Sequence, residues 1–309
     1  MSKDDVPFFS IVIPVYNEEN NIEYLYDSIN RELEGLHYEL IYVDDGSTDN
    51  SSTLVKNIVG KDKNAKGAIL SRNFGHQAAL KAGIDIAKGE FIITMDGDGQ
   101  NPPGVIHSMI DKYQKGFDVV NTSRKSGKNE GIFKKLSSKL FYFTFNSISN
   151  YKIPKNSSDF RLMSREAIKS YCQLSERVRF NRGLSVWIGF RQTTIDFTPN
   201  ERSYGKTKYS KKKMFSLGID AITSFSSTPL RISFVLGLII TFLGVIYSIY
   251  AIIQFYNHQV IRGWTSIIIL VLIIGGIQLI SIGLIGEYLS KIFYETKNRP
   301  IYIIKEILE

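Results

Sequence analysis

The chain has 309 residues and carries 38 Lys and Arg against 30 Asp and Glu, which gives a formal net charge of +8. With 43% hydrophobic and 22% charged residues, the composition excludes a disordered chain, and the length allows about two domains. The single cysteine, Cys172, excludes a disulfide framework and a zinc site built on cysteines.

Strand-like and helix-like runs alternate over the first 125 residues. The expected elements are, in chain order, strand 9–15, helix 20–34, strand 38–43, helix 49–59, strand 68–70, helix 77–87, strand 91–95 and strand 118–121. This alternation predicts an α/β domain whose mostly parallel sheet has helices on both faces. Ligands of such sheets bind beyond the carboxyl ends of the strands.

Two long apolar runs follow near the C-terminus. Residues 232–255 carry no charge, and residues 265–289 carry one acid, Glu287. A helix needs about 20 apolar residues to cross a bilayer, so we expect two transmembrane helices, with buried soluble helices as the alternative. Lys and Arg flank both runs on their outer sides, whereas the connector holds only Arg262. The positive-inside rule therefore predicts a multi-pass protein of the cell membrane, with the α/β domain and both termini in the cytoplasm.

Two basic and partly apolar segments, 131–149 and 211–227, are typical of helices that lie in the membrane interface. Packing of these segments onto the α/β domain is the alternative. We expect four parts along the chain: the cytoplasmic α/β domain at 1–210, a juxtamembrane amphipathic helix at 211–231, two transmembrane helices with a short external connector at 232–290, and a cytoplasmic C-terminal tail at 291–309.

The segment MDGDGQ, residues 95–100, carries the main chemical signal. Asp96 and Asp98 follow a predicted buried strand, and Gln100 adds an amide oxygen. Mg²⁺ is typically held by one or two carboxylates together with waters and substrate phosphates. We therefore expect a divalent cation, Mg²⁺ or Mn²⁺, on these three side chains, with a solvated acidic turn as the alternative. The glycines do not complete a dinucleotide fingerprint, and the sequence has no Gly-Lys-Ser/Thr phosphate loop, which argues against dehydrogenases and P-loop NTPases.

Further motifs end the first three predicted strands: PVYNEE at 14–19, DDGSTD at 44–49 and LSRNFG at 70–75. In this order and spacing, together with MDGDGQ, they resemble the family 2 glycosyltransferases. That resemblance implies the GT-A fold, which is a Rossmann-like α/β domain with a mostly parallel sheet.

Three later motifs extend the resemblance to one branch of that family. They are DFRLM at 159–163, RFNRG at 179–183 and RSYGKTKYS at 202–210. The branch comprises the polyprenyl-phosphate glycosyltransferases, which include dolichol-phosphate mannose synthase and the GtrB-like bacterial enzymes with two C-terminal spans. The resemblance covers residues 8–303, so it also implies interfacial helices and two C-terminal transmembrane helices.

The resemblance implies a membrane-bound inverting enzyme that moves a hexose-type sugar from a nucleotide-sugar to polyprenyl (undecaprenyl) phosphate. UDP is preferred over GDP, and the sequence does not name the sugar. The residues that would line the nucleotide-sugar pocket are Pro14, Tyr16, Glu18, Asp44, Asp45 and Asp96. Asp45 can instead cap the helix that follows it, and Tyr16 can instead pack at the end of its strand.

The acceptor in this reaction is a phosphate monoester with a second pKa of about 6, so at neutral pH it is already a nucleophile. It needs positive charge and positioning more than a strong base. The candidates for holding it are Arg124, Lys134, Lys135, Arg202 and Lys208.

Three residues are the catalytic candidates: Asp159, Arg202 and Lys208. The resemblance makes Asp159 the candidate base, but it can equally orient the acceptor or a sugar hydroxyl, and an ion pair with a nearby arginine is the structural alternative. Arg202 and Lys208 can alternatively bind only anionic lipid. His76 follows the third predicted strand and is assigned no catalytic role, because a lone histidine is more often structural.

Two other functions stay open. A processive polysaccharide synthase of the same superfamily carries a Gln-x-x-Arg-Trp segment, but neither Trp187 nor Trp264 has this context. A non-catalytic membrane adaptor with a transferase-like domain is the second alternative. The expected partners are the nucleotide-sugar, polyprenyl phosphate and the lipid bilayer, without nucleic acid. Small residues in the spans permit a homo-oligomer. A downstream flippase and a second glycosyltransferase would use the product.

Overall fold

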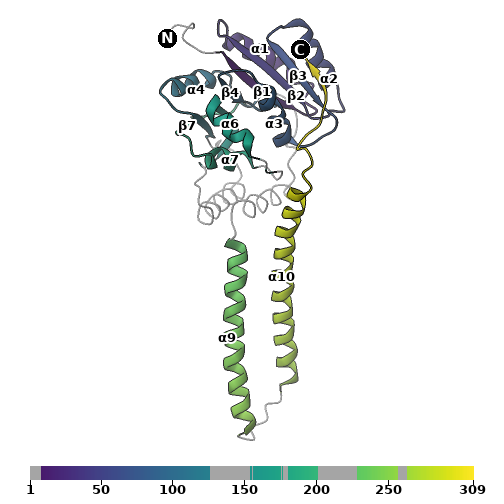
Figure 1. Ribbon diagram of the computed structural model, residues 1–309, viewed down its shortest axis with the longest axis vertical. Helices are drawn as coiled ribbons and strands as arrows, with labels where there is room; N and C mark the ends of the chain where they lie inside the picture. The colour runs from purple at the N-terminus through teal and green to yellow at the C-terminus, as the bar shows by residue number, and fades with distance from the viewer. Residues whose placement is uncertain are drawn as a thin grey trace. The chain divides into compact units, whose positions relative to one another are not determined.

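The computed structural model describes residues 8–125, 154, 156–174, 176, 180–200, 228–256 and 263–309. The chain divides into two compact units (Figure 1). The first unit spans residues 1–221 together with 299–309, and the second spans residues 222–298. The end of the chain therefore belongs to the N-terminal unit.

A sheet of eight strands forms the centre of the first unit in the described part of the chain (Figure 1). The strands are β1 (Phe9–Val15), β2 (Tyr38–Asp44), β3 (Ala65–Leu70), β4 (Phe91–Thr94), β5 (Val119–Arg124), β6 (Ser157–Ser164), β7 (Gln192–Phe197) and β8 (Ile304–Leu308). Their order across the sheet is β7-β5-β6-β4-β1-β2-β3-β8. Strands β6 and β8 run antiparallel to their neighbours, and all other neighbours are parallel. The predicted α/β class with a mostly parallel sheet is confirmed.

Helices connect these strands. They are α1 (Ile22–Glu32), α2 (Ser51–Lys61), α3 (His76–Ile86), α4 (Val105–Gln114), α6 (Arg165–Gln173) and α7 (Asn181–Trp187). Helix α1 buries Ile22, Leu25 and Ile29, which lie three and four residues apart and so share one helix face. All seven residues of β1 are buried, as expected for a central strand that is covered on both faces.

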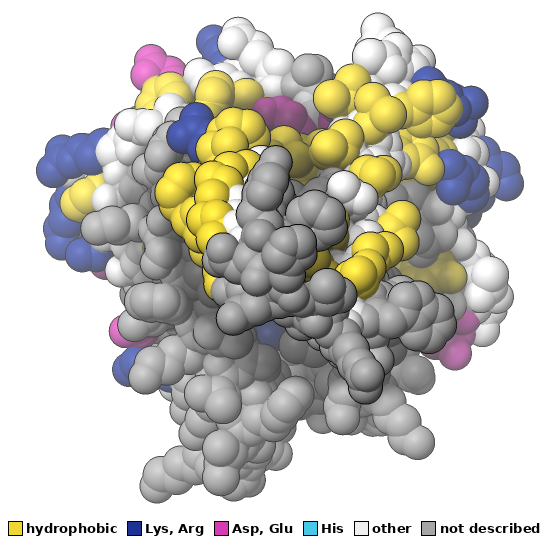
Figure 2. Space-filling view, turned by 90° about the horizontal axis from the view of Figure 1, so that it is seen from below, with side chains coloured by type: hydrophobic (Ala, Val, Ile, Leu, Met, Phe, Trp, Pro, Cys, Tyr) yellow, Lys and Arg dark blue, Asp and Glu magenta, His cyan; other side chains and the backbone are white. Residues whose placement is uncertain are grey.

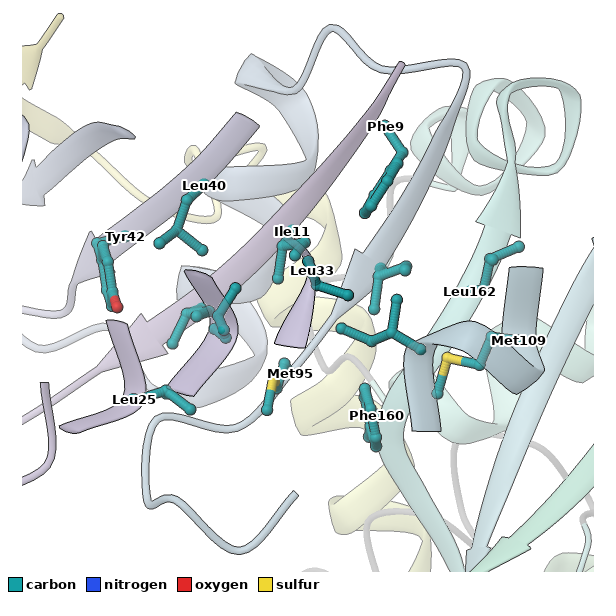
Figure 3. Packing of buried hydrophobic residues seen from close by; sticks show 14 of the residues in the cluster. Phe9, Ile11, Leu25, Leu33, Leu40, Tyr42, Met95, Met109, Phe160 and Leu162 are labelled. Atoms are coloured by element: carbon teal, nitrogen blue, oxygen red, sulfur yellow. The ribbon is translucent and has the colours of Figure 1, made fainter. Parts of the chain in front are cut away.

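The core of this unit holds large apolar side chains from the strands and from α1 and α4 (Figure 3). The rings of Phe9 on β1 and Phe91 on β4 stack with their centroids 4.9 Å apart, and Ile11 and Leu162 are fully buried. Burial of each such side chain contributes about 1.5–3 kcal/mol. The core therefore gives the loops at the sheet edge a rigid base.

Strand β8 departs from the prediction, because the sequence predicts a tail at residues 291–309. It pairs antiparallel with β3, with Gly67 opposite Leu308. Just before it, the Ile303 carbonyl accepts a hydrogen bond of 2.9 Å from the Ser71 amide, and the Tyr302 hydroxyl donates one of 2.6 Å to Asp85 on α3. The end of the chain therefore contacts both β3 and α3.

The second unit contains helices α9 (Thr228–Tyr256) and α10 (Trp264–Thr296). Within the described residues, the candidate membrane spans of these helices are Leu230–Tyr247 and Ile273–Thr296, with mean hydropathies of 2.2 and 1.5, and neither is buried. Figure 2 shows hydrophobic side chains exposed on this face of the described part of the chain. Both helices are long and apolar enough to cross a membrane.

Candidate active site

The strand directions bring the predicted site residues to one edge of the sheet. The carboxyl ends of β1, β2, β3, β4 and β5 lie at this edge, because these strands run in the same direction. Strand β6 runs the opposite way, so its first residues reach the same edge. Thr94 on β4 is the register partner of Arg161 on β6. Asp96 follows Thr94 by two residues, and Asp159 precedes Arg161 by two residues. The two aspartates therefore come near one another.

On the β4 side of this edge, Asp96 and Gln100 share one guanidinium. Arg124, the last residue of β5, donates from Nη2 to Asp96 Oδ2 at 3.0 Å and from Nη1 to Gln100 Oε1 at 3.1 Å. Asn101 Nδ2 also donates to Asp96 Oδ2, at 3.2 Å, and Asp98 Oδ1 accepts a bond of 3.1 Å from the Gln100 amide. Arg124, predicted to hold the acceptor, lies here on the residues predicted to hold the metal.

These oxygens suit a hard divalent cation. Those of Asp96 and Gln100 already converge on the positive charge of Arg124, within 3.0 and 3.1 Å. Asp98 lies on the same loop and supplies a second carboxylate. Among the described residues, no group of three or more His, Cys, Asp or Glu side chains is placed to hold a metal ion. A set of two carboxylates and an amide matches the usual mode of Mg²⁺, in which substrate phosphates and waters supply the remaining ligands.

The loop that carries Asp96 and Asp98 is held against its neighbours. A Cβ atom on Gly97 would lie 2.8 Å from the Pro14 carbonyl oxygen, so only glycine lets the loop pass this close to the end of β1. The Gln100 carbonyl accepts a hydrogen bond of 2.9 Å from the Asn200 amide. Asn200, the last described residue before Arg202, is therefore held against this loop.

On the β6 side, Asp159 is buried among hydrogen-bond donors. Arg161 Nη2 donates to Oδ1 at 3.2 Å, and Arg182 Nη2, at the start of α7, donates to Oδ2 at 3.2 Å. Gln77 Nε2, on α3, donates to Oδ2 at 3.4 Å. The guanidinium of Arg161 also donates to the Asn181 and Ser158 carbonyls. Of the alternatives set out for Asp159, the ion pair with nearby arginines is present.

This environment fixes the charge of Asp159. Burial by itself would raise the pKa of Asp159, but the charges of Arg182 and Arg161 outweigh burial and hold that pKa well below its usual range. Burial also lowers the pKa of Arg161, while the Asp159 charge opposes this change. Asp159 is therefore an anion throughout the neutral pH range, and an anion of such low basicity is a poor proton acceptor.

Asp44 and Asp45, at the end of β2, accept hydrogen bonds from neighbouring loops. Asp45 accepts hydrogen bonds from the Phe74 and Gly75 amides, at 2.7 and 2.9 Å, so it holds the loop before α3. The alternative in which Asp45 caps the helix after β2 is therefore wrong. Burial raises the pKa of Asp45, and these two amide bonds oppose the rise. Asp44 instead accepts from the Ser47 amide and the Ser52 hydroxyl.

The remaining predicted nucleotide residues surround the same edge. Pro14 is buried at the end of β1, whereas the Tyr16 ring is exposed beyond it. Glu18 accepts a hydrogen bond of 2.7 Å from Asn21 Nδ2. The phosphate and catalytic candidates Lys134, Lys135, Arg202 and Lys208 lie outside the described residues, as do segments 131–149 and 211–227.

Residues to which the sequence assigns no role in the site complete the arrangement. They are His76, Gln77, Asn101, Arg161 and Arg182. Arg161 and Arg182 lie within motifs that carry the family resemblance, which is the available signal for them. His76 and Gln77 carry no such signal, because a single polar pair at the start of a helix has no informative spacing.

Comparison with known proteins identifies the family. Residues 10–172 match Glycosyl transferase family 2, and residues 228–292 match the GtrB C-terminal hairpin. The chain belongs to glycosyltransferase family 2. The GtrB C-terminal hairpin match covers most of the two apolar helices, α9 and α10.

Relatives of this family 2 glycosyltransferase align over nearly their whole length. An uncharacterized glycosyltransferase from Synechocystis is 40% identical over 96% of this chain and 95% of the relative. The bactoprenol glucosyl transferase of Shigella phage SfII is 37% identical over 96% and 97%. A prophage bactoprenol glucosyl transferase homolog from Escherichia coli is 37% identical over 96% and 98%.

The fold is shared with more distant enzymes. Glucosyl-3-phosphoglycerate synthase from Mycobacterium tuberculosis, solved in complex with UDP, superposes with a TM-score of 0.50 at 19% identity, over 72% of this chain and 80% of that chain. At this identity the likeness shows the fold alone. The family 2 glycosyltransferase described here therefore has a GT-A-like α/β fold, as expected from its sequence, and it is an enzyme.

Proposed function

We propose that this enzyme transfers a hexose-type sugar from a UDP-sugar to polyprenyl phosphate at the cytoplasmic face of a membrane. The observation that carries the proposal is the meeting of the Asp96–Gln100 loop and Asp159 at one sheet edge, in a chain that also contains two apolar helices. The relatives named bactoprenol glucosyl transferase support polyprenyl phosphate as the acceptor and glucose as the first sugar to test.

The β4 side of the site suits the donor. Asp96, Asp98 and Gln100 would hold a divalent cation, Mg²⁺ or Mn²⁺, which when bound neutralises the charge that develops on the departing diphosphate. Arg124 occupies two of these oxygens at 3.0 and 3.1 Å, and its side chain is 35% exposed, so it can turn away and offer its charge to a phosphate instead. Pro14, Tyr16, Glu18, Asp44 and Asp45 would surround the nucleotide.

The β6 side suits the acceptor. Asp159 is held as an anion by Arg161 and Arg182, so we assign it an orienting role in place of proton removal. The dianionic acceptor phosphate carries its own nucleophilic oxygen. This oxygen bonds to the anomeric carbon as the bond to the nucleoside diphosphate breaks, and no proton has to be removed. A direct displacement of this kind inverts the anomeric configuration.

Positive charge near the acceptor is proposed to come from Lys134, Lys135, Arg202 and Lys208. Two connections of the described chain support their nearness to the site. Arg124, the last residue of β5, donates to the predicted metal loop and lies ten residues before Lys134 in the sequence. Asn200, two residues before Arg202, donates a hydrogen bond to the Gln100 carbonyl of the same loop. The acceptor phosphate and the diphosphate of the donor are both anions. Holding them together for in-line reaction requires cationic groups near each of them.

We also propose the membrane arrangement expected from the flanking charges. In it, residues 1–210 form the catalytic domain, residues 211–231 lie at the membrane surface, residues 232–290 contain the two spans, and both termini are cytoplasmic. The sugar-linked lipid would then be handed to a flippase and to a second transferase on the other side of the membrane.

The test is transfer of radiolabelled sugar into organic-extractable polyprenyl phosphate by the full-length protein in detergent. UDP-glucose is tried first, then other UDP- and GDP-sugars, with Mg²⁺ or Mn²⁺ and with EDTA. We expect label in the lipid phase that EDTA abolishes. Absence of lipid label with every donor, in protein that still binds UDP, would contradict the acceptor assignment. Label in a polymer would instead indicate a polysaccharide synthase.

A further inference from the structure

The side chain of His76 lies between the two halves of the site. Its Nε2 atom is 3.4 Å from Asp96 Oδ1 on the β4 side and 3.9 Å from Asp159 Oδ2 on the β6 side. The side chain is 31% exposed, so a ligand in the site can reach it. His76 therefore faces both carboxylates from a position that is open to a ligand.

The hydrogen-bonding capacity of His76 Nε2 is not used up by these contacts. Both carboxylates are acceptors only, which favours a hydrogen on Nε2. Hydrogen bonds from N–H to O are usually 2.7–3.2 Å long, so separations of 3.4 and 3.9 Å are weak contacts. A ligand oxygen that comes closer to Nε2 than either carboxylate can therefore accept a short hydrogen bond from it.

The backbone holds this donor in position. His76 is the first residue of α3, and Gly75 before it has φ of +98°, a conformation that favours glycine. Asp45 fixes the preceding amides of Phe74 and Gly75. The next residue, Gln77, donates to Asp159 and accepts a bond of 3.1 Å from the Asn181 amide at the start of α7. Fixed neighbours on both sides reduce the entropy that His76 loses when it binds a ligand.

The position of His76 selects the part of the substrate that it meets. In the proposed reaction, the diphosphate lies by Asp96 and Asp98, and the acceptor phosphate lies on the Asp159 side. The group that lies between them is the sugar being transferred. We propose that His76 is a binding and specificity residue for this sugar, donating a hydrogen bond from Nε2 to one of its hydroxyl groups. This inference rests on the proposed function for the identity of the transferred group.

The experiment compares binding of UDP-glucose with binding of UDP, measured by calorimetry on the full-length protein in detergent with Mg²⁺. In His76→Ala, we expect the Kd of UDP-glucose to rise about fivefold to tenfold, the equivalent of one hydrogen bond, and the Kd of UDP to stay within about twofold. His76→Gln keeps an N–H donor and should recover part of the loss. The KM for polyprenyl phosphate should not change.

A matched control is His107→Ala. His107 lies on α4, 3.9 Å from Glu32, and has a 49% exposed side chain. This variant should bind both ligands as the wild type does. Deoxy analogues of UDP-glucose sharpen the test, because the analogue that lacks the contacted hydroxyl should bind wild type and His76→Ala equally well. Thermal unfolding of each variant shows whether a loss of binding is due to misfolding. If His76→Ala misfolds, His76→Gln serves as the test variant.

Three results would overturn the inference. Equal weakening of UDP and UDP-glucose would place His76 at the nucleotide or the cation. An increase confined to the KM for polyprenyl phosphate would place His76 at the acceptor. Unchanged binding of both UDP-glucose and UDP would leave it a structural residue. A different result would contradict the proposed function alone: wild type binds UDP-glucose in a His76-dependent way but transfers no sugar to polyprenyl phosphate. Wild type that binds UDP but no UDP-sugar would overturn both.

Discussion

Asp96 and Asp159 lie on either side of His76, and the protein holds these two carboxylates in opposite ways. The Asp96 side chain is 19% exposed, and its guanidinium partner Arg124 is 35% exposed. The Asp159 side chain is 7% exposed, and its partner Arg161 is 3% exposed and also bonded to main-chain carbonyls. One ion pair is open to exchange with ligands, whereas the other is part of the interior.

The difference shows how one residue type can serve two purposes in one site. An exposed ion pair contributes little to stability, so its partner can be replaced by a ligand at small cost. A buried pair is different, because removal of one partner leaves an uncompensated charge in the interior. Variants on the Asp96 side should therefore change ligand binding and catalysis, and variants on the Asp159 side should also change folding.

The largest expected effect on activity comes from a substitution in the loop that carries Asp96 and Asp98. Asp98→Ala should lower metal-dependent transfer by about a thousandfold, because loss of a cation ligand removes several kcal/mol of charge stabilisation. Its thermal unfolding should change little, since Asp98 is a partly exposed loop residue. Transfer assays and unfolding curves of the same sample check both statements. Full activity in this variant would end the assignment of Asp98 to the metal.

Asp159→Asn should combine loss of transfer with loss of stability. We expect the free energy of unfolding to fall by about 3 kcal/mol, because Arg161 then keeps its buried charge without a counter-charge. The control is Asp118→Asn, since Asp118 accepts a hydrogen bond of 3.1 Å from Ser164 near the opposite end of β6. In this control, the free energy of unfolding should fall by about 1 kcal/mol. Wild-type stability in Asp159→Asn would remove the contrast between the two carboxylates.

Arg124→Gln should tighten binding of Mn²⁺ to the nucleotide-free protein by about tenfold, because the guanidinium no longer competes for Asp96 and Gln100. Electron paramagnetic resonance of free Mn²⁺ measures this without any turnover. Arg191→Gln is the matched control, since Arg191 lies over the Phe117 ring and carries the same charge. Weaker Mn²⁺ binding in Arg124→Gln would show that Arg124 supports the metal site and does not compete with it.

The buried carboxylate of Asp159 should also make the stability of the protein depend on pH. The pKa of Asp159 is lower in the folded protein than in the unfolded chain, where it is about 3.9. Its stabilisation is therefore complete above about pH 4 and is lost as pH falls through the folded value. The stability difference between wild type and Asp159→Asn should stay constant from pH 5 to about 8 and shrink below about pH 4. A difference that changes near neutral pH would contradict the assigned charge state.

The smallest effect is expected at an ion pair far from the site. Lys56 and Glu306 are 2.7 Å apart, with side chains 45% and 42% exposed. Lys56→Ala should lower the free energy of unfolding by less than about 1 kcal/mol and leave transfer unchanged. Thermal unfolding measures the first effect. A loss as large as that of Asp159→Asn would show that exposure does not separate the two kinds of ion pair in this protein.

The sequence predicts the elements whose signal is local. Strand β1 is apolar except for Ser10 and has Pro14 near its end, and the structure gives the predicted bounds, Phe9–Val15. Strand β8 has alternating burial, but its residues follow a long apolar helix and lie far in the chain from β3, so their pairing has no local signal. Strand β6 contains the motif DFRLM, which carries the family resemblance, but its antiparallel direction is likewise a property of the assembled sheet.

The site is predictable in its residue types and only partly in its contacts. Asp96, Asp98 and Gln100 can be grouped from the sequence because they lie close together in it. The contact between Arg124 and Asp96 depends on the strand order β4-β6-β5, which brings residues 28 positions apart to one edge. His76 has no sequence signal at all, because its significance comes from the position of Asp159, which β6 supplies from far along the chain.

The pairing of β8 with β3 has a consequence for biosynthesis. Residues 304–308 leave the ribosome after both apolar helices, so β3 remains an open edge while these helices are made. An unpaired edge strand readily accepts another strand, which exposes the nascent protein to aggregation until β8 has been made. A soluble fragment that ends before Thr228 would keep this open edge, and a synthetic peptide with the sequence of residues 299–309 would be expected to complete it by strand addition.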